Sequence, residues 1–369
     1  MTIAIVATSG ISLINFRGRL IQRWVQLGHR VVAISIETPE EMSTAIAILG
    51  AEYRQVAGSR TGIGIREGIT MIKAYRKAFE EIAPDHVFLY MSKPVAFGGI
   101  GALHAGVPHI QILVNGLENA YYRHGLKDRL VRTVMSILYR YVGRRSDNVF
   151  VQNQDIYDFF RSNRINDGHN MSVINGSGVD MRYFAQKPLP DNAVFLMTAR
   201  LLWSKGIREY LSAIPIVKAA CPQARFMLVG GLDHNDESLS QAELDSAITD
   251  GFIEYLGFAD DVRPYLERCS VYVLPSYHEG VPRSVLEAMA VGRAIITTNA
   301  PGCRDTVADG QNGYLVPIGD AKTLAAHMIT LARNPALRRS MGQSSRNRCA
   351  QIFEVNKINH ITNHKMGLE

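Results

Sequence analysis

Two glutamates separated by seven residues, Glu279 and Glu287, are the side chains of this 369-residue chain best suited to chemistry. They lie in the stretch VYVLPSYHEGVPRSVLEAMAVGRAIITT, residues 271–298. A carboxylate repels a phosphate and accepts hydrogen bonds from hydroxyls, so the expected partners of both are sugar or ribose hydroxyls. Because a pair with this spacing also arises by chance, the interpretation depends on the elements around it.

The elements around the two glutamates predict an anion site. An apolar strand-like run, VYVL, ends at Pro275, and a turn at Gly280 leads to Pro282, a residue that the first position of a helix tolerates. The predicted helix over 282–290 would direct its free N–H groups and the positive end of its dipole towards the carboxyl edge of a sheet. This arrangement favours a bound diphosphate.

A second segment, TARLLWSKGIREYL over 198–211, supplies two cations. A predicted strand ends at Arg200, and Lys205 with Gly206 precedes a predicted helix over about 207–219. Two fixed positive charges at this edge suit a diphosphate leaving group, on which charge builds as a glycosidic bond breaks. An Arg and a Lys near a turn are weak evidence for a phosphate site when they occur alone. Here they accompany the glutamate segment over 271–298, which strengthens the prediction.

The elements that must position these side chains repeat as strand and helix pairs in both halves of the chain. The runs TIAIVAT, RVVAISI, DHVFLY and HIQILV alternate with helical patterns in the first half, and VFLMTA, ARFMLVGG, FIEYLGF, VYVLPS and AIITTN do so in the second. Such alternation predicts parallel sheets covered by helices. Glycine, asparagine and proline gather over 164–189. We therefore expect two doubly wound α/β domains, 1–170 and 180–349.

The motif over 279–287 resembles the E-x7-E motif of glycosyltransferase family 4, whose members are retaining enzymes of the GT-B fold. The flanks PSYHEG, SVLEAMA and AIITTNAPG also look like that family. The resemblance implies two Rossmann-like domains facing across a cleft, with a C-terminal helix over about 350–369 that returns to the first domain. It implies that Glu279 contacts hydroxyls of the transferred sugar and that Glu287 holds the nucleotide ribose. It places further donor contacts at Gly10, Gly280, Val281, Pro282 and Val285.

The resemblance also implies roles for the two cations and a mechanism. Similar R…K-G residues bind the donor phosphates in the family, which assigns Arg200 and Lys205 to the leaving diphosphate. The favoured mechanism is a same-face attack in which the acceptor hydroxyl gives its proton to that leaving group, so no acid/base pair of carboxylates is needed. The adjacent Asp260 and Asp261 start a predicted helix and form no DxD motif. We therefore expect no metal and no cofactor.

Further segments resemble bacterial enzymes that extend polyprenyl-diphosphate-linked oligosaccharides: NFR near Asn15, NGLENAYYRHGLKDRLVR, ARLLWSKG and LVGGLDHN. The resemblance implies a UDP-sugar donor and transfer of a hexose or an N-acetylhexosamine, with N-acetylgalactosamine in an α-1,3 linkage as the first candidate, in surface-glycan, O-antigen or protein-glycan assembly. A histidine common in the N-terminal domain of the family is replaced here by Asn115 and Glu118, which leaves the catalytic partner from that domain open. The candidates for acceptor contact are Asn115, Glu118, Tyr121 and Tyr122.

Basic residues gather over 123–145, where seven Lys and Arg side chains stand against the single acid Asp128 among apolar residues. This pattern predicts a basic amphipathic helix on an anionic membrane, which attracts each cation by about 1 kcal/mol while apolar side chains enter the interface. The alternative is a helix that packs its apolar side on the first domain, and both can hold. We therefore expect a peripheral enzyme at the inner, cytoplasmic face of the cytoplasmic membrane.

Other classes of protein fit the sequence less well. A nicotinamide oxidoreductase is disfavoured because Gly10 alone follows the first strand and no G-x-G-x-x-G spacing occurs. A non-hydrolysing UDP-sugar epimerase shares the fold class and stays an alternative, as does a glycosyltransferase with a soluble acceptor. The net charge is +6, but the half that carries the donor motifs is not strongly basic, so we expect no nucleic-acid partner. Four scattered cysteines, with neither a signal peptide nor an apolar run of membrane length, fit a reducing cytoplasm.

Overall fold

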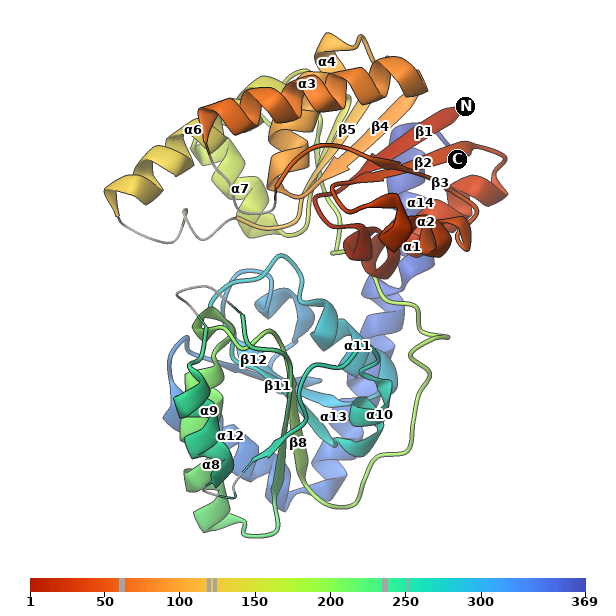
Figure 1. Cartoon of the computed structure of the whole chain (residues 1–369). Coiled ribbons are helices and arrows are strands. Elements are labelled where there is room, and N and C mark those ends of the chain that lie inside the picture. The colour runs from red at the N-terminus through yellow and green to blue at the C-terminus, as the bar shows by residue number, and fades with distance from the viewer. Residues whose placement is uncertain (60–63, 118–120, 122–124, 234–237, 250, 252) are drawn as a thin grey trace. The chain divides into compact units, whose positions relative to one another are not determined.

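A computed structural model describes residues 1–59, 64–117, 121, 125–233, 238–249, 251 and 253–369. The chain divides into two compact units (Figure 1), the first made of Met1–Ser177 with Ile358–Glu369 and the second of Gly178–Lys357. The observed boundary falls inside the interval 170–180 that separates the two predicted domains. The return to the first unit begins at Ile358, later than the predicted residue 350.

The first unit is built on a seven-stranded parallel sheet in the order β3-β2-β1-β4-β5-β6-β7. Its apolar side chains alternate between two buried faces, Ile3 and Ile5 on one and Ala4 and Val6 on the other. Burial on both faces explains why the strands read as continuous apolar runs. The strands are β1 (Thr2–Val6), β2 (Arg30–Ser35), β3 (Glu52–Gln55), β4 (His86–Tyr90), β5 (His109–Val114), β6 (Asn148–Val151) and β7 (Met171–Val173).

Helices cover both faces of this sheet. The face of Ala4 and Val6 packs against α3 (Ile65–Ile82), the π-helical turn η1 (Pro94–Gly98), α4 (Gly99–His104), α6 (Leu126–Gly143) and α7 (Gln154–Ser162). The opposite face packs against α1 (Gly10–Gln26), α2 (Pro39–Ala47) and α14 (Val355–Met366).

The second unit repeats the design with a six-stranded parallel sheet in the order β10-β9-β8-β11-β12-β13. The strand order reverses between β8 and β11, so the loops that leave these two strands diverge at their carboxyl ends, which is where open α/β sheets bind ligands. The strands are β8 (Val194–Thr198), β9 (Arg225–Val229), β10 (Glu254–Tyr255), β11 (Val271–Leu274), β12 (Ala294–Thr298) and β13 (Gly313–Val316). The helices are α8 (Ile207–Ala220), α9 (Gln241–Thr249), α10 (Arg263–Arg268), α11 (Arg283–Val291), α12 (Ala321–Arg333) and α13 (Pro335–Arg348), with short helical turns η2 (Trp203–Lys205), η3 (Arg304–Thr306) and η4 (Cys349–Phe353).

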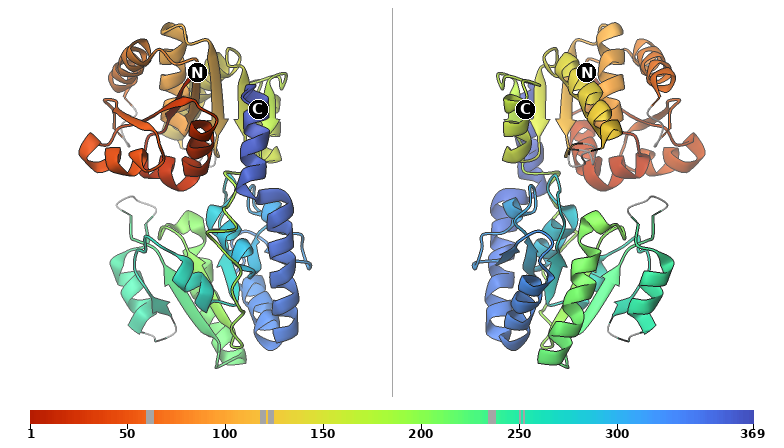
Figure 2. Two further views of the ribbon diagram at one scale, coloured as in Figure 1. Left: turned by 90° about the vertical axis from the view of Figure 1, so that its right-hand side faces the viewer. Right: turned by 90° about the vertical axis from the view of Figure 1, so that its left-hand side faces the viewer.

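The C-terminal helix returns to the first unit, as predicted, but it is not one continuous helix from residue 350. After α13 the π-helical turn η4 leads to Glu354, whose extended backbone forms a β-bridge with Val179, and α14 begins only at Val355. The indole N–H of Trp24 in α1 donates to Oδ1 of Asn363 in α14 at 2.8 Å. This buried hydrogen bond fixes the end of the chain beside α1, and both termini lie in the first unit (Figure 2).

The basic helix predicted over 123–145 is observed as α6, Leu126–Gly143. Its side chains Met135, Tyr139 and Val142 are buried in the core of the first unit. One face of the helix therefore packs on the first domain, which was the alternative to membrane binding. Among the residues that the structure describes, no helix is both long and apolar enough to span a bilayer.

Candidate active site

The loops after β8 and β11 bring Lys205 and Glu279 together at the switch point of the second sheet. Lys205 Nζ lies 2.6 Å from Glu279 Oε1, and the two side chains are only 21% and 16% exposed. Sequence motifs 74 residues apart were predicted to meet at this edge, and the structure confirms that they do. In this structure each of the two groups thus neutralises the other.

Ser276 fixes the position of the Glu279 carboxylate. Its hydroxyl oxygen lies 3.1 Å from Glu279 Oε1 and 3.1 Å from the carbonyl oxygen of Ser204, and Ser276 is fully buried. The Glu279 amide donates to the carbonyl of Pro301 at 3.0 Å. Sequence reasoning missed Ser276, although it is the first polar residue after the apolar run VYVLP.

Two glycines let the loops approach this closely. Gly206, next to Lys205, has φ +77°, and a Cβ there would lie 2.1 Å from the carbonyl oxygen of Pro275. Gly302 has φ +76°, and its Cβ would lie 2.1 Å from the carbonyl oxygen of Gly280 in the turn after Glu279. Both positions combine a left-handed backbone with a backbone contact, which other residues do not tolerate.

The helix after Glu279 starts one residue later than predicted. Pro282 has ψ 110° and is the extended residue before α11, so Arg283 is the first helical residue. Val285 was predicted to contact the donor, but its side chain is fully buried in the core and its amide donates to the carbonyl of Pro282 at 3.1 Å. The Val285 side chain therefore belongs to the core of the second unit, and a contact with the donor stays a prediction. Gly280 and Val281 do form the turn between the glutamate loop and the helix.

Glu287 lies in the second turn of α11, against Arg283. The distance from Arg283 Nε to Glu287 Oε1 is 3.1 Å, and the two side chains are 21% and 14% exposed. Burial raises the pKa of Glu287 to about 7, while the charge of Arg283 acts in the opposite direction. The carboxylate form of Glu287 therefore depends on pH close to neutrality.

Arg200 lies in the loop that leaves β8 and is paired with an acid that sequence reasoning missed. Its Nη1 lies 2.9 Å from Oδ2 of Asp233, with the arginine side chain 67% exposed. Asp233 follows β9 in the segment LVGGLD, so it belongs to the neighbouring loop of the same sheet edge. Both cations predicted to hold a diphosphate are thus bound to carboxylates in this structure.

In the first unit, Gly10 and Asn115 have structural partners. The Gly10 amide donates to Glu37 Oε2 at 2.9 Å, and a Cβ at Gly10 would lie 2.6 Å from Met42 Sδ. Asn115 Oδ1 accepts from the Met91 amide at 3.2 Å, where Met91 has the unusual φ of 68°. These contacts account for both residues locally, and a role in substrate contact stays a prediction.

The other acceptor candidates divide into one buried residue and two outside the described residues. Tyr121 is 9% exposed, its ring meets Phe159 edge-on at 5.3 Å, and its hydroxyl lies 3.2 Å from Ser136 Oγ. Packing in the first unit therefore accounts for Tyr121. Glu118 and Tyr122 lie outside the residues that the structure describes.

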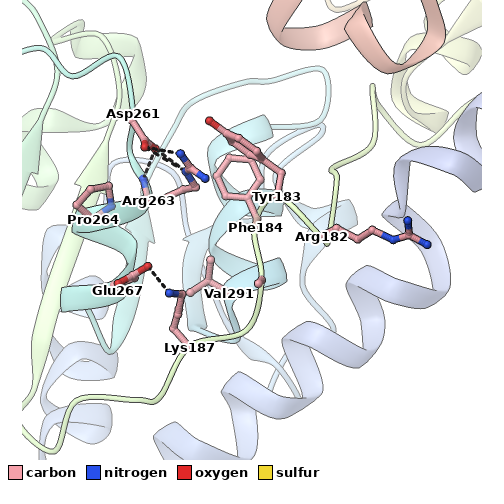
Figure 3. Close-up of a pocket in the computed structure, with 10 residues that line it drawn as sticks. Arg182, Tyr183, Phe184, Lys187, Asp261, Arg263, Pro264, Glu267 and Val291 are labelled. Atoms are coloured by element: carbon pink, nitrogen blue, oxygen red, sulfur yellow. Dashed lines mark hydrogen bonds and ion pairs between the residues drawn. The ribbon is translucent and has the colours of Figure 1, made fainter. Parts of the chain in front are cut away.

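Asp261 binds Arg263, the first residue of α10, while the N-cap residue of that helix is Val262. Asp261 Oδ1 accepts from the Arg263 amide at 3.0 Å, and both carboxylate oxygens bind the Arg263 guanidinium. Figure 3 shows this pair at one end of a pocket of about 450 Å³, where Arg263 also covers the Tyr183 ring at 3.9 Å. Among the described residues, no group of three or more His, Cys, Asp and Glu side chains is arranged to hold a metal ion.

Two family models match the chain. "Glycosyl transferase 4-like domain" matches residues 15–176, and "Glycosyl transferases group 1" matches residues 192–334. Together they cover most of both units. The second match includes the Lys205–Glu279 pair and α11.

One relative matches over nearly the full length of both chains. The N,N'-diacetylbacillosaminyl-diphospho-undecaprenol alpha-1,3-N-acetylgalactosaminyltransferase of Campylobacter jejuni is 27% identical over 96% of this chain and 95% of its own. The capsular polysaccharide biosynthesis glycosyltransferase CapM of Staphylococcus aureus is 27% identical over 45% of this chain and 44% of its own.

Solved structures share the fold. Anabaena HepE in complex with UDP-glucose superimposes with a TM-score of 0.80 at 18% identity, covering 100% of this chain and 99% of that one. Sucrose-phosphate synthase from Thermosynechococcus elongatus gives a TM-score of 0.80 at 17% identity, covering 99% and 98%. With two Rossmann-like units, the paired site residues and both family models in agreement, the chain belongs to glycosyltransferase family 4 and has the GT-B fold.

Proposed function

We propose that the chain is a retaining transferase that moves an N-acetylhexosamine, with N-acetylgalactosamine and an α-1,3 linkage as the best candidate, from a UDP-sugar to a polyprenyl-diphosphate-linked sugar. The acceptor would lie at the inner face of the cytoplasmic membrane, in surface-glycan, O-antigen or protein-glycan assembly. The observation that carries the proposal is the Lys205–Glu279 pair at the switch point of the second sheet, beside the start of α11. The Campylobacter relative, named for a lipid-linked acceptor, supports the choice of acceptor class.

The chemistry follows from the charges of these side chains. Lys205 forms an ion pair with the diphosphate of the donor. Arg200 and the positive end of the α11 dipole neutralise the rest of its negative charge. Once released from Lys205, the Glu279 carboxylate accepts hydrogen bonds from hydroxyls of the sugar, and Glu287 accepts those of the ribose. The acceptor oxygen bonds to the anomeric carbon as the bond to the diphosphate breaks, and its proton passes to the leaving phosphate oxygen. Because these groups supply the positive charge, we propose that the transfer needs no metal ion.

A donor panel tests this function. The enzyme is incubated with UDP-GalNAc, UDP-GlcNAc, UDP-galactose and UDP-glucose, each with a short-chain polyprenyl-diphosphate-linked acetamido sugar and each with and without EDTA. We expect transfer to the lipid-linked sugar, fastest from UDP-GalNAc and unchanged by EDTA. Transfer only to soluble sugars would contradict the lipid-linked acceptor, and isomerisation of a UDP-sugar without acceptor would instead identify an epimerase.

We further propose that α6 attaches the enzyme to an anionic membrane. One face of α6 packs on the first unit, yet large apolar side chains three or four positions apart are exposed on another face. An exposed apolar stripe on one helix, with cations at both ends, complements a bilayer surface that is apolar below and anionic above. The stripe consists of Leu126, Leu130, Val134, Ile137 and Tyr141, and its exposed cations are Lys127, Arg129, Arg144 and Arg145.

Replacing Leu130 and Ile137 by glutamine will weaken binding to vesicles that contain anionic lipid by about a hundredfold or more, since each buried leucine or isoleucine contributes about 1.5–3 kcal/mol. Co-sedimentation with vesicles measures the binding. The matched control replaces Ile69 and Ile216, which are 49% and 43% exposed on other helices, and should bind like the wild type. If both double variants bind vesicles equally well, the apolar stripe of α6 is not the surface that contacts the membrane.

A further inference from the structure

We propose that Arg283 is a positioning residue, whose guanidinium holds the Glu287 carboxylate ionised and oriented to accept hydrogen bonds from the ribose hydroxyls of the donor. The inference rests on the proposed function, because it takes Glu287 as the ribose contact. The E-x7-E pattern does not specify Arg283, because the seven positions between its two glutamates can hold any residue.

The geometry ties Arg283 to Glu287 along one side of α11. Arg283 is the first residue of the helix and Glu287 stands four residues later, so the two side chains lie above each other. Their 3.1 Å contact is shielded, because the side chains are only 21% and 14% exposed. In such a place a charge interacts more strongly than at an open surface, so losing the arginine leaves a carboxylate in a site that disfavours its charge.

The groups that face Glu287 from other elements do not stabilise its charge. Asp261, in the loop before α10, disfavours the ionised form of Glu287, although Arg263 binds both oxygens of Asp261 (Figure 3). Tyr272, on β11, is fully buried, and burial raises its pKa far above neutrality, so it contributes no charge. Its hydroxyl donates to the Thr198 carbonyl at 3.0 Å. The favourable charge on Glu287 therefore comes from Arg283.

The direction of the pH effect follows from these charges. Ribose hydroxyls need the ionised carboxylate as acceptor, so affinity for the nucleotide is greatest above the pKa of Glu287, about 7, and falls as the pH drops below it. Removing the positive charge of Arg283 raises that pKa further. The pH at which affinity is lost must then move upwards.

The experiment measures UDP binding by isothermal titration calorimetry between pH 6 and pH 9. In Arg283→Met, which keeps the apolar stem, we expect the midpoint to move up by about one pH unit or more, and UDP to bind more weakly by about fivefold or more at pH 7. Arg283→Lys keeps a cation and should recover most of the loss. The control nucleotide is 2′,3′-dideoxy-UDP, which lacks both ribose hydroxyls and keeps the diphosphate of UDP. Wild type and Arg283→Met should bind this nucleotide with equal affinity.

Each other outcome has a distinct meaning. An equal loss of both nucleotides in Arg283→Met would overturn the inference and make Arg283 a diphosphate cation. An unshifted midpoint with UDP would also overturn it. If wild type binds no UDP at any pH, the proposed function fails and not the role of Arg283 alone. Unfolding curves of all variants in denaturant show whether a loss of binding reflects a loss of fold.

Discussion

Replacing Lys205 by alanine will lower kcat for sugar transfer by about a hundredfold to a thousandfold, the range found when one preorganised charge at a reacting centre is removed. In the proposed mechanism the variant loses the cation that meets the developing charge on the diphosphate. It also removes the ion-pair partner of Glu279, which would leave a bare carboxylate beside that diphosphate, so KM for the UDP-sugar should rise as well. Initial rates over a range of donor concentrations measure both constants.

The matched control for this prediction is Lys218→Ala. Lys218 lies on α8, the helix that follows Lys205, and its ammonium donates to the backbone carbonyl of Pro222 at the surface. We expect its kinetics to equal those of the wild type. The double variant Lys205→Ala with Glu279→Gln should lose much less than the sum of the single losses, because contacting residues act as a unit. Additive losses, or a Lys205→Ala enzyme with unchanged kcat, would contradict the pairing of these residues in the reaction.

The predictable part of the fold is the part with long, doubly buried strands. β1, β2, β4, β5, β8, β9, β11 and β12 carry apolar residues on both faces, and each was located from that signal. The edge strand β3, with the sequence EYRQ, has mainly exposed positions and gives no such signal. The break at Glu354 was missed because its cause is a bridge to Val179, which only the folded chain reveals.

The site could be predicted as far as topology alone brings residues together. Because loops after β8 and β11 leave the same switch point, the meeting of Lys205 and Glu279 followed from the motifs. The partner of Arg200 could not be predicted, since Asp233 follows a different strand and carries no motif of its own. The burial of Val285 could not be predicted either, because the motif that named it does not show which residues of the following helix face the core.

The ion pairs of the candidate site also suggest how it accommodates a charged donor. Lys205, Arg200 and Glu287 each have an oppositely charged partner in this structure, so none is left as a buried bare charge. In the proposed function, a diphosphate that binds Lys205 would free Glu279 to contact the sugar. Donor binding and orientation of the sugar contact would then be coupled through one exchange of ion-pair partners.

Replacing Gly302 by alanine will lower the free energy of unfolding of the second unit by about 2–5 kcal/mol. A left-handed backbone at a residue with a Cβ costs about 1–2 kcal/mol, and overpacking costs about 1–3 kcal/mol more. The new methyl group would lie 2.1 Å from the carbonyl oxygen of Gly280 and 2.4 Å from that of Glu279, so the glutamate turn must move. Denaturant unfolding measures the stability, and UDP titration measures the site.

Gly310 separates the two contributions to this effect. It has φ +73° in the same part of the chain, but nothing lies within 4 Å of its Cβ position, so Gly310→Ala reports the backbone strain alone. We expect Gly310→Ala to lose about 1–2 kcal/mol of stability and no UDP affinity. Gly302→Ala should also lose transfer activity by about a hundredfold, as a displacement of about 1 Å at a reacting centre does. Equal stability and activity in the two variants would mean that the packing of Gly302 against the turn does not hold Glu279 in place.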